Sequence, residues 1–123
     1  MDGGKFMKKK FLAVYIGTPS SADNKWANLT EAEKTKRAEE GMKAWGAWAH
    51  KYASVIKDMG APLGKTKRVD EKGVSDTKNA LTAYTLIEAD SHEEAAKIFL
   101  NHPHFTIFPG DSVEIVECLP MPT

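Results

Sequence analysis

The chain has one cysteine, no long apolar run and no surplus of charge of either sign. Cys118 alone excludes an internal disulfide and a multi-cysteine zinc site, and it fits a reducing, cytoplasmic location. Lys plus Arg and Asp plus Glu number 17 each, so no net field attracts phosphate backbones or an acidic membrane. No apolar stretch approaches the roughly 20 residues that cross a bilayer. We therefore expect neither nucleic acid nor a membrane as a partner.

Length and composition point to one domain. A chain of 123 residues with 41% hydrophobic and 28% charged content can bury one core. We expect a loose leader at residues 1–7 and a single domain over residues 8–123. The basic start at 7–10 and the apolar run at 11–16 resemble a signal peptide in outline. The run is short and no small-x-small cleavage site follows it, so we expect a strand instead.

Periodicity and turn formers divide the chain into alternating elements. Four segments are rich in β-branched and aromatic residues or alternate, and they predict strands near residues 9–16, 54–59, 81–89 and 112–119. Helices are expected from Thr30 and from Ser91, each with glutamates in its first turn. The polar stretch at 65–79 contains Gly73 and predicts a loop or a hairpin-like excursion. We expect Cys118, on the last strand, to be a small buried residue.

The first helix carries an aromatic stripe. Met42, Trp45, Ala49 and Tyr52 follow one another at steps of three, four and three, which places them on one face. We expect this stripe to face the sheet, with Trp48 at its edge.

The order strand, helix, strand, strand, helix, strand predicts an α+β fold of the ferredoxin-like type. In this βαββαβ sandwich, a four-stranded antiparallel sheet carries two helices on one face. The first strand is apolar on both sides, with Leu12, Val14 and Ile16 on one and Phe11, Ala13 and Tyr15 on the other. An apolar sheet face without helices favours a homodimer in which sheet faces sheet.

Three segments carry a resemblance to a known family. The chain resembles the YCII-related proteins in "MGAPLG" at 59–64, "SHEEAAKIFLNHPHF" at 91–105 and "VEIVECLP" at 113–120. The resemblance extends from about residue 8 to the end of the chain. It implies membership of the dimeric α/β-barrel superfamily, a ferredoxin-like protomer, a homodimer and a cleft that serves as active site.

The resemblance also implies a histidine on the first helix and an aspartate before a proline after the second. This chain departs from both positions. Met42 or Lys43 stands where the histidine is expected, and His102 stands before Pro103 in place of the aspartate. The family's dyad is therefore absent, while a titratable group remains at the second position.

His102 and His104 flank Pro103 at the end of the second helix. Pro103 forces His102 out of helical geometry, and in an extended segment two alternate side chains point the same way. The pair could act as general acid or base, since imidazole titrates near neutral pH. It could bind a metal with Asp111 or Glu114 as a third ligand. A hydrogen-bonded, helix-terminating role is the preferred interpretation, and we assign no metal and no cofactor.

Aromatic and loop residues are further candidates for a ligand site. Tyr15, Trp45 and Trp48 could line a pocket for an apolar or aromatic molecule, although core packing would also explain them. Ser75 and Asp76 lie on the polar loop and could hold a substrate, or could simply make turn hydrogen bonds.

Three functional classes follow from these observations. We prefer a homodimer that binds a small organic molecule in a cleft between sheet and helices, near Tyr15, Trp45, His102 and His104. The second class is a small-molecule enzyme that uses His102 or His104 as general acid or base. The third is a non-catalytic accessory module whose apolar sheet face serves only assembly.

Overall fold

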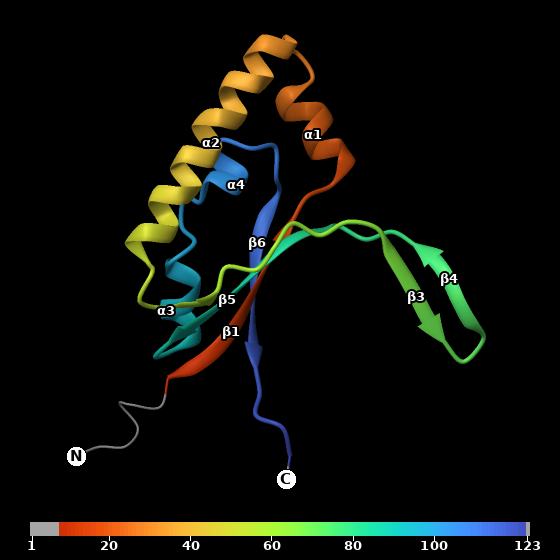
Figure 1. Ribbon diagram of the computed structural model, residues 1–123, viewed down its shortest axis with the longest axis vertical. Coiled ribbons are helices and arrows are strands. Elements are labelled where there is room, and N and C mark those ends of the chain that lie inside the picture. Colours follow the sequence, from red (N-terminus) through yellow and green to blue (C-terminus); the bar gives the residue numbers. More distant parts are fainter. Residues whose placement is uncertain (1–7, 123) are drawn as a thin grey trace.

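The computed structural model describes residues 8–122 (Figure 1). Its elements in chain order are β1 (Lys9–Ile16), α1 (Pro19–Trp26), α2 (Glu31–Lys51), β2 (Ile56–Asp58), β3 (Thr66–Asp70), β4 (Gly73–Thr77), β5 (Leu81–Ala89), α3 (His92–Lys97), α4 (Pro103–Thr106) and β6 (Ser112–Cys118). The leader expected at residues 1–7 lies outside the described residues. Within 8–122, no helix is both long enough and apolar enough to cross a membrane.

One antiparallel sheet forms the centre of the molecule. Its strands lie in the order β2, β5, β1, β6, while β3 and β4 pair only with each other. Helices α2, α3 and α4 lie on one side of this sheet (Figure 1). The arrangement is a mixed α+β fold consistent with the ferredoxin-like type, which confirms the predicted class. The dimeric barrel requires a second copy and stays a prediction.

Side chains of β1 alternate between the two faces of the sheet. Phe11, Ala13 and Tyr15 are fully buried under the helices, whereas Leu12 and Val14 point the other way and stay partly exposed. Burial of large apolar side chains on the helix side stabilises the sheet against the helices.

The opposite side of the sheet is apolar but has no helix on it. We call it the bare face. Alternate residues of the three longer strands, paired across the sheet, make its apolar centre (Leu12, Val14, Tyr84, Leu86 and Val116), and Lys10, Glu88 and Glu114 lie on the same face. Val116 is 49% exposed. Cys118 lies at the end of the same strand and is exposed, so the expectation that it is buried is wrong.

Helix α2 begins at a capping box and packs most of the predicted stripe, Trp45, Ala49 and Tyr52, against the core, as expected. The Thr30 hydroxyl accepts from the Glu33 N–H, and the Glu33 carboxylate accepts from the Thr30 N–H (3.1 and 2.8 Å). Trp48 is only 8% exposed and donates its indole N–H to the Ile98 carbonyl. Met42 is 65% exposed instead. Trp48 thus lies deeper in the core than predicted, where its indole N–H has a hydrogen-bond partner.

The segment predicted as a hairpin-like excursion is a two-stranded hairpin, which we call the arm (residues 66–77). It leaves the body near one end of the sheet and points away from the helices, toward the side of the bare face (Figure 1). Lys67 pairs with Asp76 across its strands, and Val69 lies opposite Val74.

Candidate functional site

A cluster of rings fills the space between the sheet and α2. His102 lies at its centre and is fully buried. Its ring centroid is 4.5 Å from that of Trp45, 4.6 Å from Trp48, 5.2 Å from Tyr15 and 5.7 Å from Phe99. Three segments that are distant in sequence, β1, α2 and the turn before α4, therefore converge on one imidazole.

The two histidines do not lie on one extended segment, because a helix begins between them, although both rings contact Tyr15 and Trp45. His102 keeps extended backbone angles before Pro103 (φ −63°, ψ 141°), as predicted, but α4 begins at Pro103. The expectation of an extended 102–104 segment is thus wrong. Proline is favoured in the first turn of a helix, and His102 acts as the N-cap by accepting the His104 N–H at Nδ1 (3.0 Å).

Burial keeps the His102 ring neutral. Desolvation lowers its pKa to about 3, with a further contribution from His104 nearby. Since Nδ1 accepts a hydrogen bond, the ring proton is on Nε2, which has no hydrogen-bond partner among the described residues. The imidazole plane is at 90° to the ring of Trp45 and at 75° to that of Trp48, so both pairs are T-shaped.

His104 is held at the end of β1. Its Nε2 donates to the Ile16 carbonyl (2.8 Å), which leaves Nδ1 of the neutral ring as the acceptor. Burial lowers the pKa of His104; the bond to Ile16 opposes that shift, the charge of Lys25 adds to it, and the charge of Asp111 opposes it. The ring is 7% exposed.

Gly110 makes room for this ring. A Cβ at Gly110 would lie 2.3 Å from both Cε1 and Nε2 of His104 and 2.5 Å from its carbonyl oxygen. The Gly110 N–H donates to that same carbonyl (3.0 Å). Close packing of the 109–111 turn on His104 therefore depends on the missing side chain.

Two adjoining cavities open beside the ring cluster, and we call them together the cleft. The larger has a volume of about 560 Å³ and the smaller about 260 Å³. They share Met42, Trp45, Pro62 and Ala83. His104, Phe108 and Gly110 belong to the larger cavity, while Tyr15 and Thr85 belong to the smaller. None of the residues that line either cavity is Asp, Glu, Lys or Arg.

The turn at Gly60 builds one wall of the cleft. Gly60 has φ +76°, and a Cβ there would lie 1.8 Å from the Tyr84 carbonyl oxygen, so this position requires glycine. The following residues then run along β5, where Leu63 donates to the Thr82 carbonyl (2.9 Å) and Pro62 lies opposite Ala83. This wall comes from the "MGAP" segment.

Tyr15 is fixed by a short hydrogen-bond chain. The Thr85 hydroxyl donates to the Met59 carbonyl (2.9 Å), so its oxygen accepts the Tyr15 O–H (3.0 Å). Burial raises the pKa of Tyr15 to about 12, partly offset by the bond to Thr85. The phenol therefore stays protonated at neutral pH.

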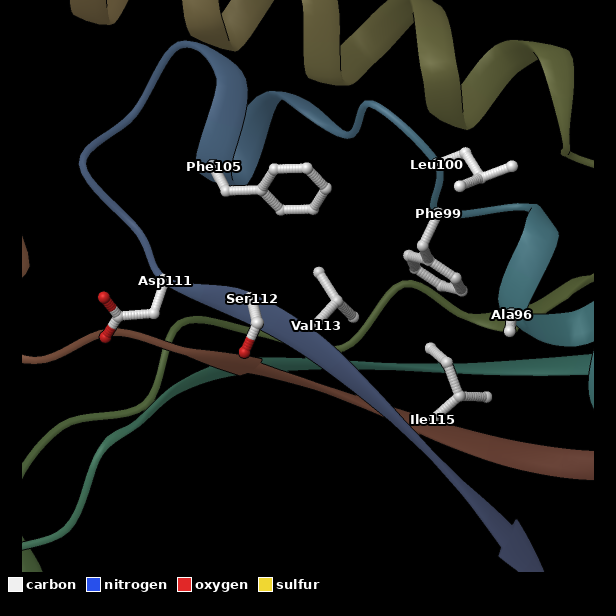
Figure 2. A pocket seen from close by; sticks show the side chains of 8 residues that line it. All are labelled: Ala96, Phe99, Leu100, Phe105, Asp111, Ser112, Val113 and Ile115. Atoms are coloured by element: carbon white, nitrogen blue, oxygen red, sulfur yellow. The ribbon is translucent and has the colours of Figure 1, made fainter.

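A separate apolar hollow of about 370 Å³ lies between β6 and the α3–α4 region. Figure 2 shows Phe99, Leu100 and Phe105 above it, with Val113 and Ile115 of β6 on its other side and the Asp111 carboxylate at its edge. Neither histidine lines it. The cleft, with His104 in its wall, is therefore the better candidate site.

The structure brings together five of the seven site residues predicted from sequence. Tyr15, Trp45 and His104 line the cleft, and Trp48 and His102 pack behind it. Ser75 and Asp76 lie on β4 of the arm, away from the ring cluster. Among the side chains that the structure describes, those of residues 8–20 and 25–122, no three His, Cys, Asp or Glu groups are placed as metal ligands.

Sequence analysis missed other residues of the cleft wall. Phe108 and Gly110 come from the connection after α4, where no periodic pattern marks them. Pro62 could have been recognised, because the glycine and proline of "MGAP" indicate a fixed turn.

Comparisons with known proteins give the fold. No protein-family model matches the chain, and no curated protein matches it. Among solved structures, it is similar to 5-chloro-2-hydroxyhydroquinone dehydrochlorinase (TftG) from Burkholderia phenoliruptrix AC1100, in complex with 2,5-dihydroxybenzoquinone. The match covers 86% of this chain and 89% of that chain, with 18% sequence identity and a TM-score of 0.50. The two proteins share a fold.

Proposed function

We propose that the protein binds a small, uncharged, flat organic molecule in the cleft. The observation that carries this proposal is the chemistry of the cleft wall, which is apolar, free of charged side chains and supplied with one imidazole, that of His104. A charged ligand would lose its hydration there without gaining an opposite charge. The larger cavity, at about 560 Å³, has the size of common small-molecule sites, about 300–1,000 Å³.

Two features favour a ring-shaped ligand. Trp45 lines both cavities, so an aromatic ring can pack against its indole. The acceptor nitrogen of neutral His104 can receive a hydrogen bond from a ligand hydroxyl or N–H. The complex of TftG with 2,5-dihydroxybenzoquinone gives additional support, because that protein of the same fold holds a flat ring.

The first experiment is a ligand screen by saturation-transfer NMR. The probes are hydroquinone, catechol and indole, each compared with a carboxylated counterpart such as 4-hydroxybenzoate. We expect the neutral compounds to receive saturation and the carboxylates not to. Preferred binding of the carboxylates would contradict the proposal.

A pair of variants on α2 locates the site. Met42→Glu places a charge in the wall shared by both cavities, whereas Ala47→Glu places the same charge on an exposed position of the same helix, outside both. We expect Met42→Glu to weaken binding of the neutral probe about tenfold, because burying the carboxylate against the ligand is unfavourable. Ala47→Glu should bind like the unmodified protein. Equal affinities for the two variants would place the site elsewhere.

A second candidate function is catalysis with His104 as general base. The lone pair on Nδ1 of the neutral His104 ring, in a residue of the cleft wall, favours this function over one that uses His102. His102 is enclosed by rings and has a pKa of about 3. Incubating each bound probe in D2O and following it by NMR tests the idea. Conversion or deuterium exchange should be lost in His104→Gln and kept in His50→Gln, an exposed histidine.

We also propose that the working unit is a homodimer in which two copies meet through their bare faces. The support is the row of apolar side chains on that face, which no element of the described chain covers. Sedimentation velocity across a hundredfold range of concentration tests it, and a monomer throughout would contradict it. If a dimer forms but no ligand binds, an accessory module that only assembles becomes the better description.

A further inference from the structure

The arm exposes apolar side chains of a kind that folded proteins usually bury. Val69 and Val74 are 74% and 70% exposed, although they lie opposite each other and form one apolar pair. A two-stranded hairpin with no third strand or helix against it is only marginally stable in water. The Val69–Val74 pair is thus a surface that would gain from a partner.

The base of the arm is fixed to the body. The Asn79 side chain donates to the Thr66 hydroxyl (3.2 Å) and accepts the Leu81 N–H (3.0 Å). These two bonds connect the start of the arm to the start of β5. The arm therefore has a defined direction, away from the helices and toward the side of the bare face (Figure 1).

The area of the bare face explains why an arm would be useful there. The three longer strands (β1, β5 and β6), spaced about 4.8 Å apart and about eight residues long at about 3.3 Å each, give a face of about 380 Å². A stable interface covers about 800 Å² on each partner. The bare face alone falls short of that value, so a dimer built on it needs additional contacts.

We propose that the arm clasps a second copy of this chain, stacked on the bare face, with Val69 and Val74 as the contact residues. The proposal rests on the homodimer proposed above and adds the element that completes the interface. A copy that covers the bare face lies on the side toward which the arm projects. Each copy contributes one arm, so a two-fold dimer has two such contacts.

The distribution of charge favours a second copy of the chain as the partner that the arm contacts. The arm (66–77) carries three basic and three acidic side chains, and Lys65 and Lys78 flank its base, so residues 65–78 together have two more basic than acidic side chains. Glu114 is exposed, pairs in register with Val14 of the bare face, and has no ion-pair partner among the described residues. The lysines that flank the base of the arm and a negative group at the sheet face are complementary between two copies.

Sedimentation velocity of the full chain and two variants tests the clasp. V69T/V74T keeps the shape and strand preference of both side chains and removes their apolar character. Ser75→Val changes the opposite face of the same arm and serves as the control, since Ser75 lies opposite Arg68 in the register. We expect V69T/V74T to raise the dimer dissociation constant at least tenfold, and Ser75→Val to leave it unchanged.

The outcomes separate the clasp from the dimer itself. If the unmodified chain dimerises and V69T/V74T dimerises with the same constant, the clasp is wrong and the bare-face dimer survives. If the unmodified chain is a monomer at every concentration, both proposals fail. A variant in which residues 66–77 are replaced by a short Gly-Ser linker should dissociate at least as readily as V69T/V74T, and a tight dimer without the arm would overturn the clasp.

Discussion

The His104 backbone N–H donates to Nδ1 of His102 over 3.0 Å. One bond thereby caps α4 and selects the tautomer of a buried imidazole. The ring proton is left on Nε2, enclosed by Trp45 and Trp48. A neutral histidine in this position is a packing element, and protonating it would require a charge inside a cage of aromatic rings.

Acid should therefore destabilise the fold through His102. The unfolded chain binds this proton near pH 6.5, while the folded protein resists it until about pH 3. Between these values the unfolded state holds more protons. The free energy of unfolding therefore falls by about 1.4 kcal/mol for each unit by which the pH is lowered. Urea unfolding measured from pH 7 to pH 4 gives the slope.

The pH slope can be assigned to His102 with two variants. His102→Asn keeps a side-chain acceptor for the His104 N–H and has no titrating ring. It should be less stable at pH 7 and show a shallower loss toward pH 4. His50→Gln changes an exposed histidine and should reproduce the slope of the unmodified protein. Equal slopes in all three proteins would show that His102 titrates normally.

Gly110 should tolerate no side chain, in contrast to Gly46. Gly110→Ala drives a methyl group against both the ring and the backbone oxygen of His104, and we expect a loss of about 3 kcal/mol. Gly46 lies within α2 with no atom near its would-be Cβ. Gly46→Ala should raise stability by about 0.5–1 kcal/mol, since alanine restricts the unfolded chain. Thermal unfolding of both variants measures the contrast, and a harmless Gly110→Ala would contradict the packing described here.

The hydroxyl of Thr85 should contribute to the stability of the fold. Thr85→Val keeps the shape but leaves the Tyr15 O–H and the Met59 carbonyl without a partner, which costs about 1–3 kcal/mol. Thr85→Ser retains the hydroxyl and loses one methyl group, for which we expect about 1 kcal/mol. Urea midpoints rank the two variants. A valine variant as stable as the serine variant would mean that water replaces the lost bonds.

The sequence predicted the elements that follow a strong pattern. Alternation and apolar content placed β1, β5 and β6 within a residue of their bounds. Gly73 with its polar neighbours predicted a loop or a hairpin-like excursion, and the segment is a hairpin. Two short helices, α1 and α4, were not predicted. Residues 19–26 have little apolar periodicity, and Pro103 was read as the end of one helix although it also begins the next turn.

The site was harder to predict than the fold, for a geometric reason. Sequence spacing reports which residues share an element, whereas the cluster joins Tyr15 on β1, Trp45 and Trp48 on α2, and His102 before α4. Their meeting depends on the rotation of α2 over the sheet. The predicted stripe placed Met42 inward and Trp48 at the edge, and packing reverses that assignment.

Asn79 belongs to two parts of the molecule at once, since it fixes the base of the arm and also lines the larger cavity of the cleft. Where a second copy holds the arm, it also holds this wall of the cleft. Subunit association and ligand binding are then thermodynamically linked, and the linkage is reciprocal: whatever factor the dimer adds to ligand affinity, the ligand adds to dimer affinity. The apparent ligand affinity of such a protein then depends on its own concentration.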